Sequence, residues 1–224
     1  MSAQQTRAII LRRTNYGEAD RILKLLTPFG QRSVIAKGVR REKSKLAGGI
    51  ELFAVSDVVI TSGKSDLGIL TSARLVQFYR HILEDYDKLQ FGYEAINVVA
   101  RVSDEINDEG WFTVLEQVYD GLNRQDIDLQ LVQSWFYLHY AELTGYALSL
   151  ERDVIGNRLD ANRRYMYDVS ERGLRPSEQG DVTADHIKYL RIISTKSLST
   201  VAQIGGAASI LPDCWLVSRQ HAAL

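Results

Sequence analysis

The sequence predicts an α+β chain, with an N-terminal β-barrel followed by an α-helical domain, on three observations. Short apolar runs alternate with turn residues over about the first 80 positions, and the apolar spacing then changes to the period of a helix. The charge changes sign at the same place: residues 1–82 hold 14 Lys and Arg against 6 Asp and Glu, whereas residues 83–150 hold 3 against 13. We therefore expect one domain over residues 1–80 and a second over residues 81–224.

Five strands are predicted from five short runs rich in Val, Ile and Leu, at residues 8–11, 21–26, 33–36, 57–61 and 67–76. Glycine-containing turn signals separate several of them, at residues 15–17, 28–30 and 62–66. Five strands in about 75 residues are typical of a small closed barrel. The longest gap, residues 40–54, lies between the third and fourth strands, where a five-stranded OB-fold barrel has its crossover.

Helices are predicted from apolar residues three and four positions apart, within residues 89–99, 111–122, 129–143 and 187–193. The third is apolar on nearly every side, which is typical of the centre of a helical bundle, and Gly145 is placed to end it. Thr183 is placed to cap the fourth. Residues 150–182 form a polar, turn-rich insertion, with a short hairpin predicted from Tyr165, Met166, Tyr167 and Val169.

The composition, with 45% hydrophobic and 25% charged residues, is that of a globular protein and excludes a disordered, collagen-like or coiled-coil chain. No apolar run approaches the roughly 20 residues that span a bilayer, and the first residues lack a signal-peptide pattern. We therefore expect a cytoplasmic protein without membrane contact. The single cysteine, Cys214, excludes an internal disulfide and a zinc site with two or more cysteine ligands.

Enzyme signatures are missing from the chain. It contains no G-x-x-x-x-G-K-[ST], G-x-G-x-x-G, G-x-S-x-G or H-E-x-x-H motif, and its four histidines have no ligand-spaced partner. We therefore predict no catalytic residue, no metal site and no cofactor.

A basic segment directly after the third strand is the strongest candidate site. Five cations occur within nine positions: Lys37, Arg40, Arg41, Lys43 and Lys45. Cations on a loop at the rim of a barrel can neutralise phosphates, and each contact releases counterions. Gly38 would let the backbone approach a phosphate closely. The alternative is a solvated loop of long charged side chains.

Further cations on neighbouring strands extend this candidate DNA-binding set: Arg12, Arg13, Lys24, Arg32 and Arg74. Tyr16 and Phe29, in turns between strands, could stack on bases, and packing within the turns is the alternative.

Several short motifs, in order along the chain, resemble the RecO family of bacterial recombination mediators. They are R-A-I-I-L at 7–11, Y-G-E-A-D-R at 16–21, L-T-P-F-G at 26–30, A-K-G-V-R-R-x-K-S-K-L at 36–46, L-T-S-A-R-L at 70–75 and, more loosely, L-T-G-Y at 143–146. The resemblance implies an N-terminal OB fold, a helical C-terminal domain and location in the cytoplasm with the nucleoid.

The resemblance also implies a function and partners. RecO proteins bind single- and double-stranded DNA and anneal complementary strands. With RecR, and in many species RecF, they load RecA onto DNA coated by single-stranded DNA-binding protein (SSB), and they contact the C-terminal tail of SSB.

One departure from the family pattern concerns zinc. Many members carry four cysteines after the G-Y segment, but residues 152–156 and 172–178 occupy the comparable places here without any cysteine. We therefore expect no zinc module, and a segment that is either held by packing or mobile. Six arginines crowd this stretch and either extend the DNA surface or are solvated: Arg152, Arg158, Arg163, Arg164, Arg172 and Arg175.

The expected mechanism is non-enzymatic. Complementary strands repel each other through their phosphates, so cations placed along both lower the encounter barrier while base edges stay free to pair. Two alternatives remain open. The chain could be an adaptor that binds SSB or RecR with weak DNA affinity, using cations such as Arg101, Arg124 or those at 152–175 for an acidic tail. It could also be an OB-type RNA-binding protein.

Overall fold

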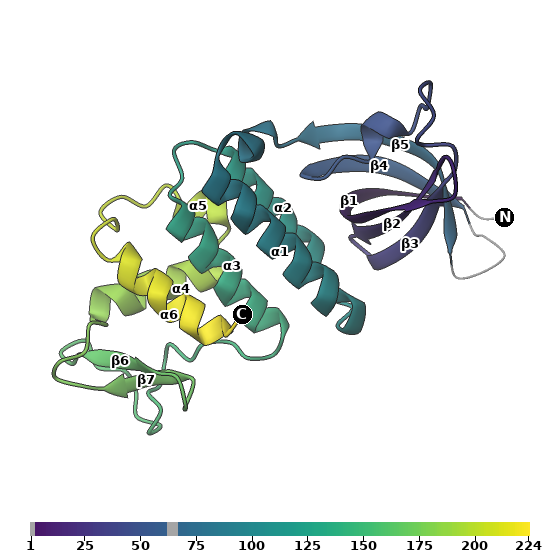
Figure 1. The fold of residues 1–224 in the computed structure, drawn as a ribbon. Helices are drawn as coiled ribbons and strands as arrows, with labels where there is room; N and C mark the ends of the chain where they lie inside the picture. Colours follow the sequence, from purple (N-terminus) through teal and green to yellow (C-terminus); the bar gives the residue numbers. More distant parts are fainter. Residues whose placement is uncertain (1–2, 62–66) are drawn as a thin grey trace. The chain divides into compact units, whose positions relative to one another are not determined.

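The computed structural model describes residues 3–61 and 67–224, which form two compact units that divide between Asn123 and Arg124 (Figure 1). The turn predicted at residues 62–66 lies outside the described residues. No helix in the described ranges is long and apolar enough to span a membrane. The predicted boundary at residue 80 falls within the first unit and stays a prediction.

The first unit begins with a closed five-stranded barrel, which confirms the predicted fold class. Its strands are β1 (Ala3–Tyr16), β2 (Asp20–Thr27), β3 (Gly30–Ala36), β4 (Ala54–Thr61) and β5 (Gly68–Phe78). They are arranged in the order β1-β2-β3-β5-β4, with β3 and β5 parallel and every other pair antiparallel. The crossover between β3 and β4 contains a short 3-10 helix, η1 (Ala47–Gly49).

The barrel interior is built from inward-facing apolar side chains: Ala8, Ile10, Leu23, Leu25, Val34, Ala36, Val39, Ile50, Val58 and Leu70. On β2 the two-residue period of a strand is plain, because Leu23 and Leu25 are fully buried and Lys24 between them is only half-buried. On β1, however, Ile9 is also fully buried although it lies between two inward residues. The outer face of the barrel is therefore covered at this point.

Ile9 belongs to an apolar row across three strands. It pairs with Leu26 on β2 and with Val55 on β4, and all three side chains are fully buried without belonging to the interior cluster. The first unit continues through η2 (Arg80–Glu84) into α1 (Tyr86–Glu105) and α2 (Gly110–Asn123). These two helices pack on the outer face of the barrel.

Specific contacts join the helices to the barrel. The Phe53 ring makes T-shaped contacts with Tyr93 of α1 and Tyr119 of α2, with ring centroids 5.1 and 5.6 Å apart. The Gln31 side-chain amide of β3 donates to the Ala100 carbonyl at 2.8 Å and to the Ser103 hydroxyl at 2.7 Å on α1. Aromatic and polar contacts thus join the barrel to the first two helices.

The second unit is helical, with α3 (Leu129–Leu143), α4 (Ala184–Thr195), α5 (Leu198–Val201) and α6 (Leu211–Ala222). The helix predicted at 129–143 is confirmed, and it packs against both α4 and α6. Gly145, at φ 82°, ends it as predicted. The indole of Trp135 is buried on α3 and donates to the Lys196 carbonyl at 2.8 Å.

The insertion at 150–182 is ordered around a small hairpin. Strands β6 (Tyr165–Asp168) and β7 (Gly173–Pro176) pair antiparallel, and Tyr165 exchanges two backbone hydrogen bonds of 2.9 Å with Val182. Tyr165, Val182 and Leu174 are all buried. Val169 lies in the turn between the strands rather than in a strand. Packing, and not mobility, therefore holds this segment.

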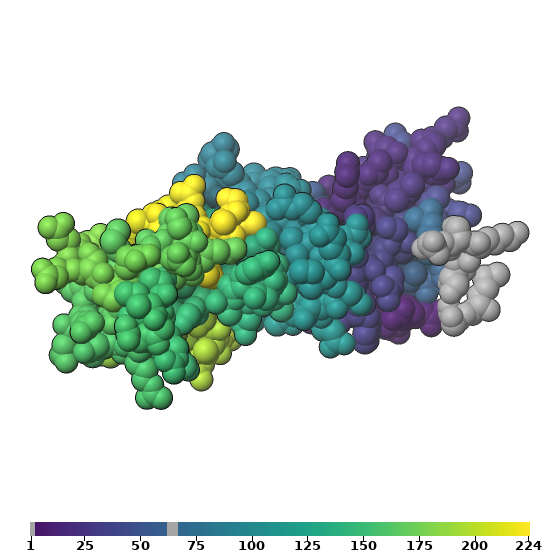
Figure 2. All heavy atoms as spheres, turned by 90° about the horizontal axis from the view of Figure 1, so that it is seen from below, coloured from purple at the N-terminus to yellow at the C-terminus, as the bar shows by residue number. Residues whose placement is uncertain are grey.

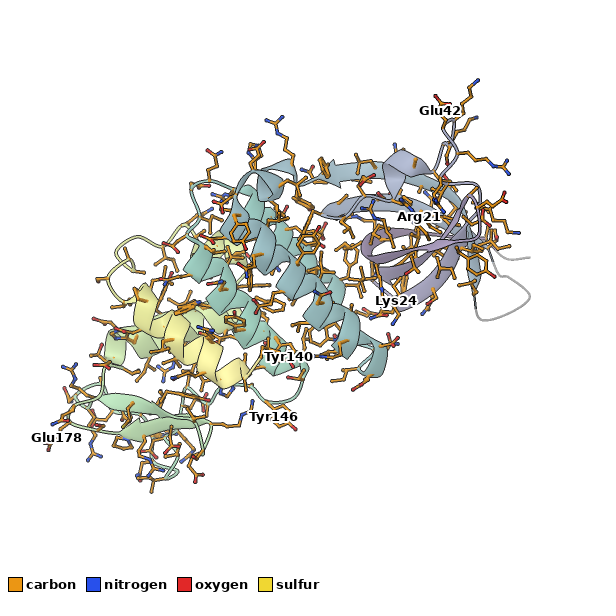
Figure 3. All side chains as sticks on the ribbon, viewed as in Figure 1. Arg21, Lys24, Glu42, Tyr140, Tyr146 and Glu178 are labelled. Atoms are coloured by element: carbon orange, nitrogen blue, oxygen red, sulfur yellow. The ribbon has the colours of Figure 1, made fainter. Side chains whose placement is uncertain are left out.

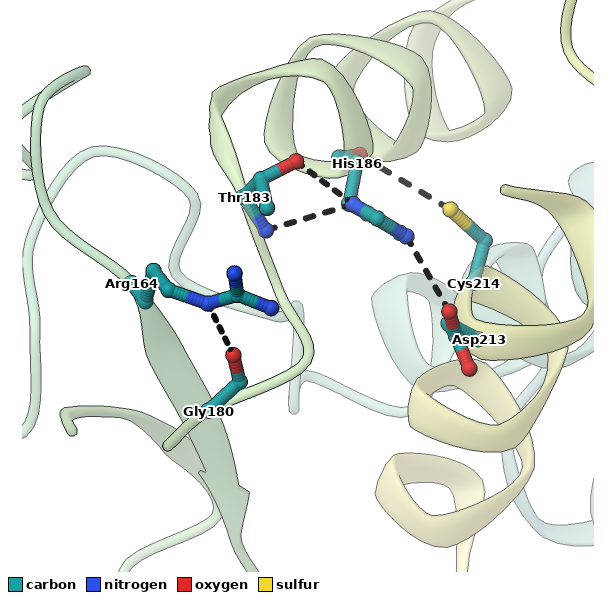
Figure 4. A network of polar contacts seen from close by, with 6 residues as sticks. All are labelled: Arg164, Gly180, Thr183, His186, Asp213 and Cys214. Atoms are coloured by element: carbon teal, nitrogen blue, oxygen red, sulfur yellow. Dashed lines mark hydrogen bonds and ion pairs between the residues drawn. The ribbon is translucent and has the colours of Figure 1, made fainter. Parts of the chain in front are cut away.

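Side-chain contacts tie the end of the insertion to the helices (Figure 4). Arg164 Nε donates to the Gly180 carbonyl at 2.7 Å. Thr183 caps α4 as predicted, with His186 Nδ1 2.8 Å from its hydroxyl, and His186 Nε2 lies 3.3 Å from Asp213 of α6. Next to it, burial raises the pKa of the Cys214 thiol to about 12. Among the described residues there is no group of three or more His, Cys, Asp and Glu side chains that could hold a metal.

Candidate nucleic-acid interface

The basic segment forms a loop that is fixed to the barrel at two places. The Val39 side chain is buried in the interior cluster and anchors the loop to the barrel interior. The loop backbone also binds the β1–β2 turn, because Gly38 N donates to Asp20 Oδ1 at 2.7 Å and Arg40 N donates to the Ala19 carbonyl at 2.9 Å. Beyond these anchors the loop projects from the barrel, with Glu42 at its tip (Figure 3).

Gly38 has a conformational role in the loop, and its predicted approach to a phosphate stays a prediction. Its φ of +64° is in the left-handed region, which glycine adopts at little cost. Its amide N–H already donates to Asp20, so the amide is not available to a phosphate. The glycine makes the turn that directs the following cations outward.

The five loop cations are all exposed, and none has a carboxylate within 4 Å among the residues that the structure describes: Lys37, Arg40, Arg41, Lys43 and Lys45. The Arg40 guanidinium donates to the Gly17 carbonyl at 3.3 Å, which orients the side chain without neutralising its charge. The loop therefore carries a concentrated positive charge that a polyanion can reach.

The cations predicted on the neighbouring strands divide into two kinds. Arg13 pairs with Glu51 at 2.9 Å, Lys24 with Asp104 at 3.1 Å, and Arg74 with Asp57 at 2.7 Å. These three charges are compensated within the protein. By contrast, Arg12 and Arg32 are exposed and have no carboxylate partner within the described part of the chain. Sequence reasoning missed the pairs because each acid lies 17 or more residues from its cation.

The two candidate stacking residues lie at opposite ends of the barrel. Tyr16 is 55% exposed and pairs with Asp20, the residue that binds the loop. Phe29 is 53% exposed in the turn after β2. Since a strand rises about 3.3 Å per residue, the eight residues of β2 separate these turns by roughly 23 Å. Tyr16 alone therefore shares a corner of the barrel with the loop.

The structure thus brings together one exposed aromatic ring and five uncompensated cations, which we call the loop surface: Tyr16, Lys37, Arg40, Arg41, Lys43 and Lys45. Cations follow a phosphate backbone regardless of sequence, and an aromatic ring stacks on any base. Such a surface suits sequence-independent contact with a nucleic acid.

Comparison with known proteins gives consistent matches. The family model for the N-terminal part of recombination protein O matches residues 1–79, and the model for its C-terminal part matches residues 83–221. The DNA repair protein RecO of Dehalococcoides mccartyi is 34% identical over 225 residues, covering 97% of this chain and 88% of that protein.

Two further relatives match over a shorter span. The DNA repair protein RecO of Rubrobacter xylanophilus is 33% identical over 67% of this chain and 61% of its own length. The DNA repair protein RecO of a Roseiflexus species is 35% identical over 63% of this chain and 50% of its own length.

Proposed function

This chain belongs to the RecO family of DNA repair proteins, and on that premise we propose that it is a non-enzymatic recombination mediator. It binds single- and double-stranded DNA, anneals complementary strands and helps to load RecA onto SSB-coated DNA together with RecR and RecF. It acts in the cytoplasm, at the nucleoid. The observation that carries the proposal is the loop surface, in which exposed cations without carboxylate partners among the described residues lie on a loop bound to the turn that follows Tyr16.

The mechanism follows from charge. When two strands approach, their phosphates repel, and the loop cations offset part of that repulsion. Because the contacts are to the backbone, base edges remain free to pair. Tyr16 adds a stacking platform that holds one unpaired base without reading its identity.

A separate surface of the first unit is the candidate for binding protein partners. Exposed apolar side chains continue from the end of β5 through η2 to the start of α1: Leu75, Val76, Phe78, Leu83 and Tyr86. A run of this kind favours a protein-binding surface. SSB, through its C-terminal tail, and RecR are the partners that the family implies.

The decisive variant is Arg40→Ala/Arg41→Ala/Lys43→Ala. We expect its affinity for single-stranded oligonucleotides to fall at least about tenfold at low salt, and similarly for all base sequences, because only backbone contacts are lost. Each phosphate contact to a single strand contributes about 0.7 to the slope of log affinity against log salt, so the slope should flatten by about 2. Fluorescence anisotropy over a salt titration measures both.

The control variant is Arg101→Ala/Lys188→Ala/Lys196→Ala, which removes three exposed cations elsewhere and gives the same net charge. It should keep the wild-type slope. If the loop variant also keeps it, the loop does not bind DNA. Annealing of complementary oligonucleotides, with and without SSB, then separates a mediator from an adaptor that binds SSB only, and matched RNA oligonucleotides test the RNA-binding alternative.

A further inference from the structure

A short irregular hairpin in the second unit places two arginines directly opposite each other. Leu159 N donates to the Glu151 carbonyl at 3.0 Å and Asp153 N to the Asn157 carbonyl at 2.9 Å, and between these bonds Arg152 and Arg158 form an isolated β-bridge. In an antiparallel pair, two opposite residues that lie between such hydrogen bonds without sharing one have Cα atoms only about 4.5 Å apart. Their side chains are therefore adjacent.

The hairpin turn is fixed from within. The buried Asp153 carboxylate accepts from the N–H groups of Ile155 and Asn157, both at 2.9 Å. This acid is therefore occupied by its own turn, and it forms no ion pair with the described arginines. The positions of Arg152 and Arg158 are consequently set by backbone geometry and not by attraction to an acid.

A third arginine reaches the same place from α4. Arg191 donates through Nε and Nη2 to the Leu150 carbonyl at 3.0 and 2.5 Å, which fixes its guanidinium. Together the three arginines line a concavity of about 330 Å³, whose other lining residues are Glu151 and Leu159. We call this set, Arg152, Arg158 and Arg191, the arginine site.

The charge of the arginine site is not balanced. Arg152 donates to the Gly156 carbonyl at 2.7 Å and Arg191 to the Leu150 carbonyl, and a carbonyl orients a guanidinium without neutralising it. None of the three has a carboxylate within 4 Å among the described residues, so Glu151 offsets one charge of three at most. Like charges directly opposite each other destabilise a strand pair. An anion bound between them would relieve that repulsion.

The same insertion has a second concavity of similar character. It has a volume of about 570 Å³ and is lined by Asn162, Arg163, Arg164, Pro176, Ser177 and Glu178. The Gly180 carbonyl holds Arg164 there (Figure 4). Residues from about 150 to 180, green in Figure 2, form an exposed surface of this unit. Two basic hollows on one exposed segment fit a ligand that repeats its negative charge.

We propose that the arginine site is a second DNA-binding site, which takes a phosphodiester group of one strand while the loop surface holds another. Guanidinium groups match the paired oxygens of a phosphate. The lining of the arginine site offers one aliphatic side chain, Leu159, and so has no pocket for the apolar residues of a peptide. The inference rests on the proposed function and extends it, because one chain could then bridge two strands.

The test uses Arg152→Gln/Arg158→Gln in the full-length chain, since glutamine keeps a polar side chain and removes the charge. Bridging is measured by energy transfer between donor- and acceptor-labelled oligonucleotides that are not complementary. We expect the variant to bind a single oligonucleotide within about twofold of wild type, to lose at least nine-tenths of the bridging signal and to anneal at least tenfold more slowly. Lys188→Gln/Lys196→Gln, with the same charge change, should bridge normally.

A second readout keeps the proposal falsifiable if the variant is merely less stable. Tripolyphosphate should raise the melting temperature of the wild type by a few degrees and that of the variant by less than one. Normal bridging by the variant would contradict the proposal that the arginine site binds DNA. Displacement of the bridged strand by an acidic peptide at equal concentration would contradict it as well. Failure of the unaltered protein to bind any oligonucleotide instead overturns the proposed function itself.

Discussion

Two histidines of the second unit lie in surroundings that disfavour the charged form of the ring. The His139 ring stacks on Trp135, with ring centroids 3.8 Å apart, and its Nδ1 lies 2.8 Å from the Trp135 carbonyl. His221 lies between the Tyr146 carbonyl, 2.6 Å from Nε2, and the Tyr167 hydroxyl, 2.9 Å from Nδ1. Burial lowers the pKa of both side chains.

These lowered pKa values predict an acid-sensitive unit. An unfolded histidine takes up a proton near pH 6.5, whereas the folded one resists, so the unfolded chain binds more protons and stability falls as the pH falls below that value. We expect the melting temperature to drop between pH 7.5 and pH 5.5. His139→Asn, which keeps a donor for the Trp135 carbonyl but cannot titrate, should show a smaller drop. Thermal unfolding at the two pH values measures it, and equal drops would contradict the assignment.

At the level of single residues, the sequence identified the cations but did not indicate which of them pair with a carboxylate. The loop cations could be chosen correctly as exposed because five of them in nine positions cannot all be buried. Lys24 is paired because Asp104, 80 residues away, lies on a helix that packs against the barrel. Only the tertiary fold determines such a pairing. Whether either kind of cation binds DNA remains a prediction.

At the scale of elements, local patterns predicted the strands and the long helices well. Period-two burial on β2 and the apolar face of α2 are local properties, and both elements occur where expected. By contrast, α6 was not predicted, since Gly205 and Gly206 precede it, Pro212 lies in its first turn, and its place depends on packing against α3 and α4. The continuous run at residues 8–11 held a further signal, because apolar residues on both faces of a strand indicate that both faces are covered.

The insertion depends on one close backbone contact. A Cβ on Gly180 would lie 2.1 Å from the Tyr165 carbonyl oxygen, a backbone atom that cannot move aside without breaking its bridge to Val182. We expect Gly180→Ala to destabilise the second unit by about 1–3 kcal/mol, the usual cost of overpacking. Hydrogen exchange at the Tyr165 and Val182 amides should accelerate. Gly205→Ala is the control, since a Cβ there meets nothing within 4 Å, and protection of both amides in Gly180→Ala would refute the account.

At the scale of the whole molecule, the barrel depends on helices that follow it in sequence. The row of Val55, Ile9 and Leu26 lies on its outer face and is fully buried, and the Phe53 ring packs against both Tyr93 and Tyr119. The pattern of the strands alone predicts the barrel. Only the packing of α1 and α2 against it shows that the compact unit continues beyond residue 80. The charge boundary near residue 82 therefore marks a change of secondary structure within the unit that ends at Asn123.

This arrangement predicts different behaviour for two fragments. Residues 1–123 should unfold in one cooperative transition, because the apolar row stays covered, whereas residues 1–80 should expose it and aggregate or remain partly folded. Circular dichroism and size-exclusion chromatography distinguish the two. Because the longer fragment keeps the loop surface but lacks the arginine site, it should bind one oligonucleotide with near wild-type affinity and fail to bridge two. A stable, monomeric 1–80 fragment would instead place the domain boundary at residue 80, and bridging by 1–123 would place both strands on the barrel.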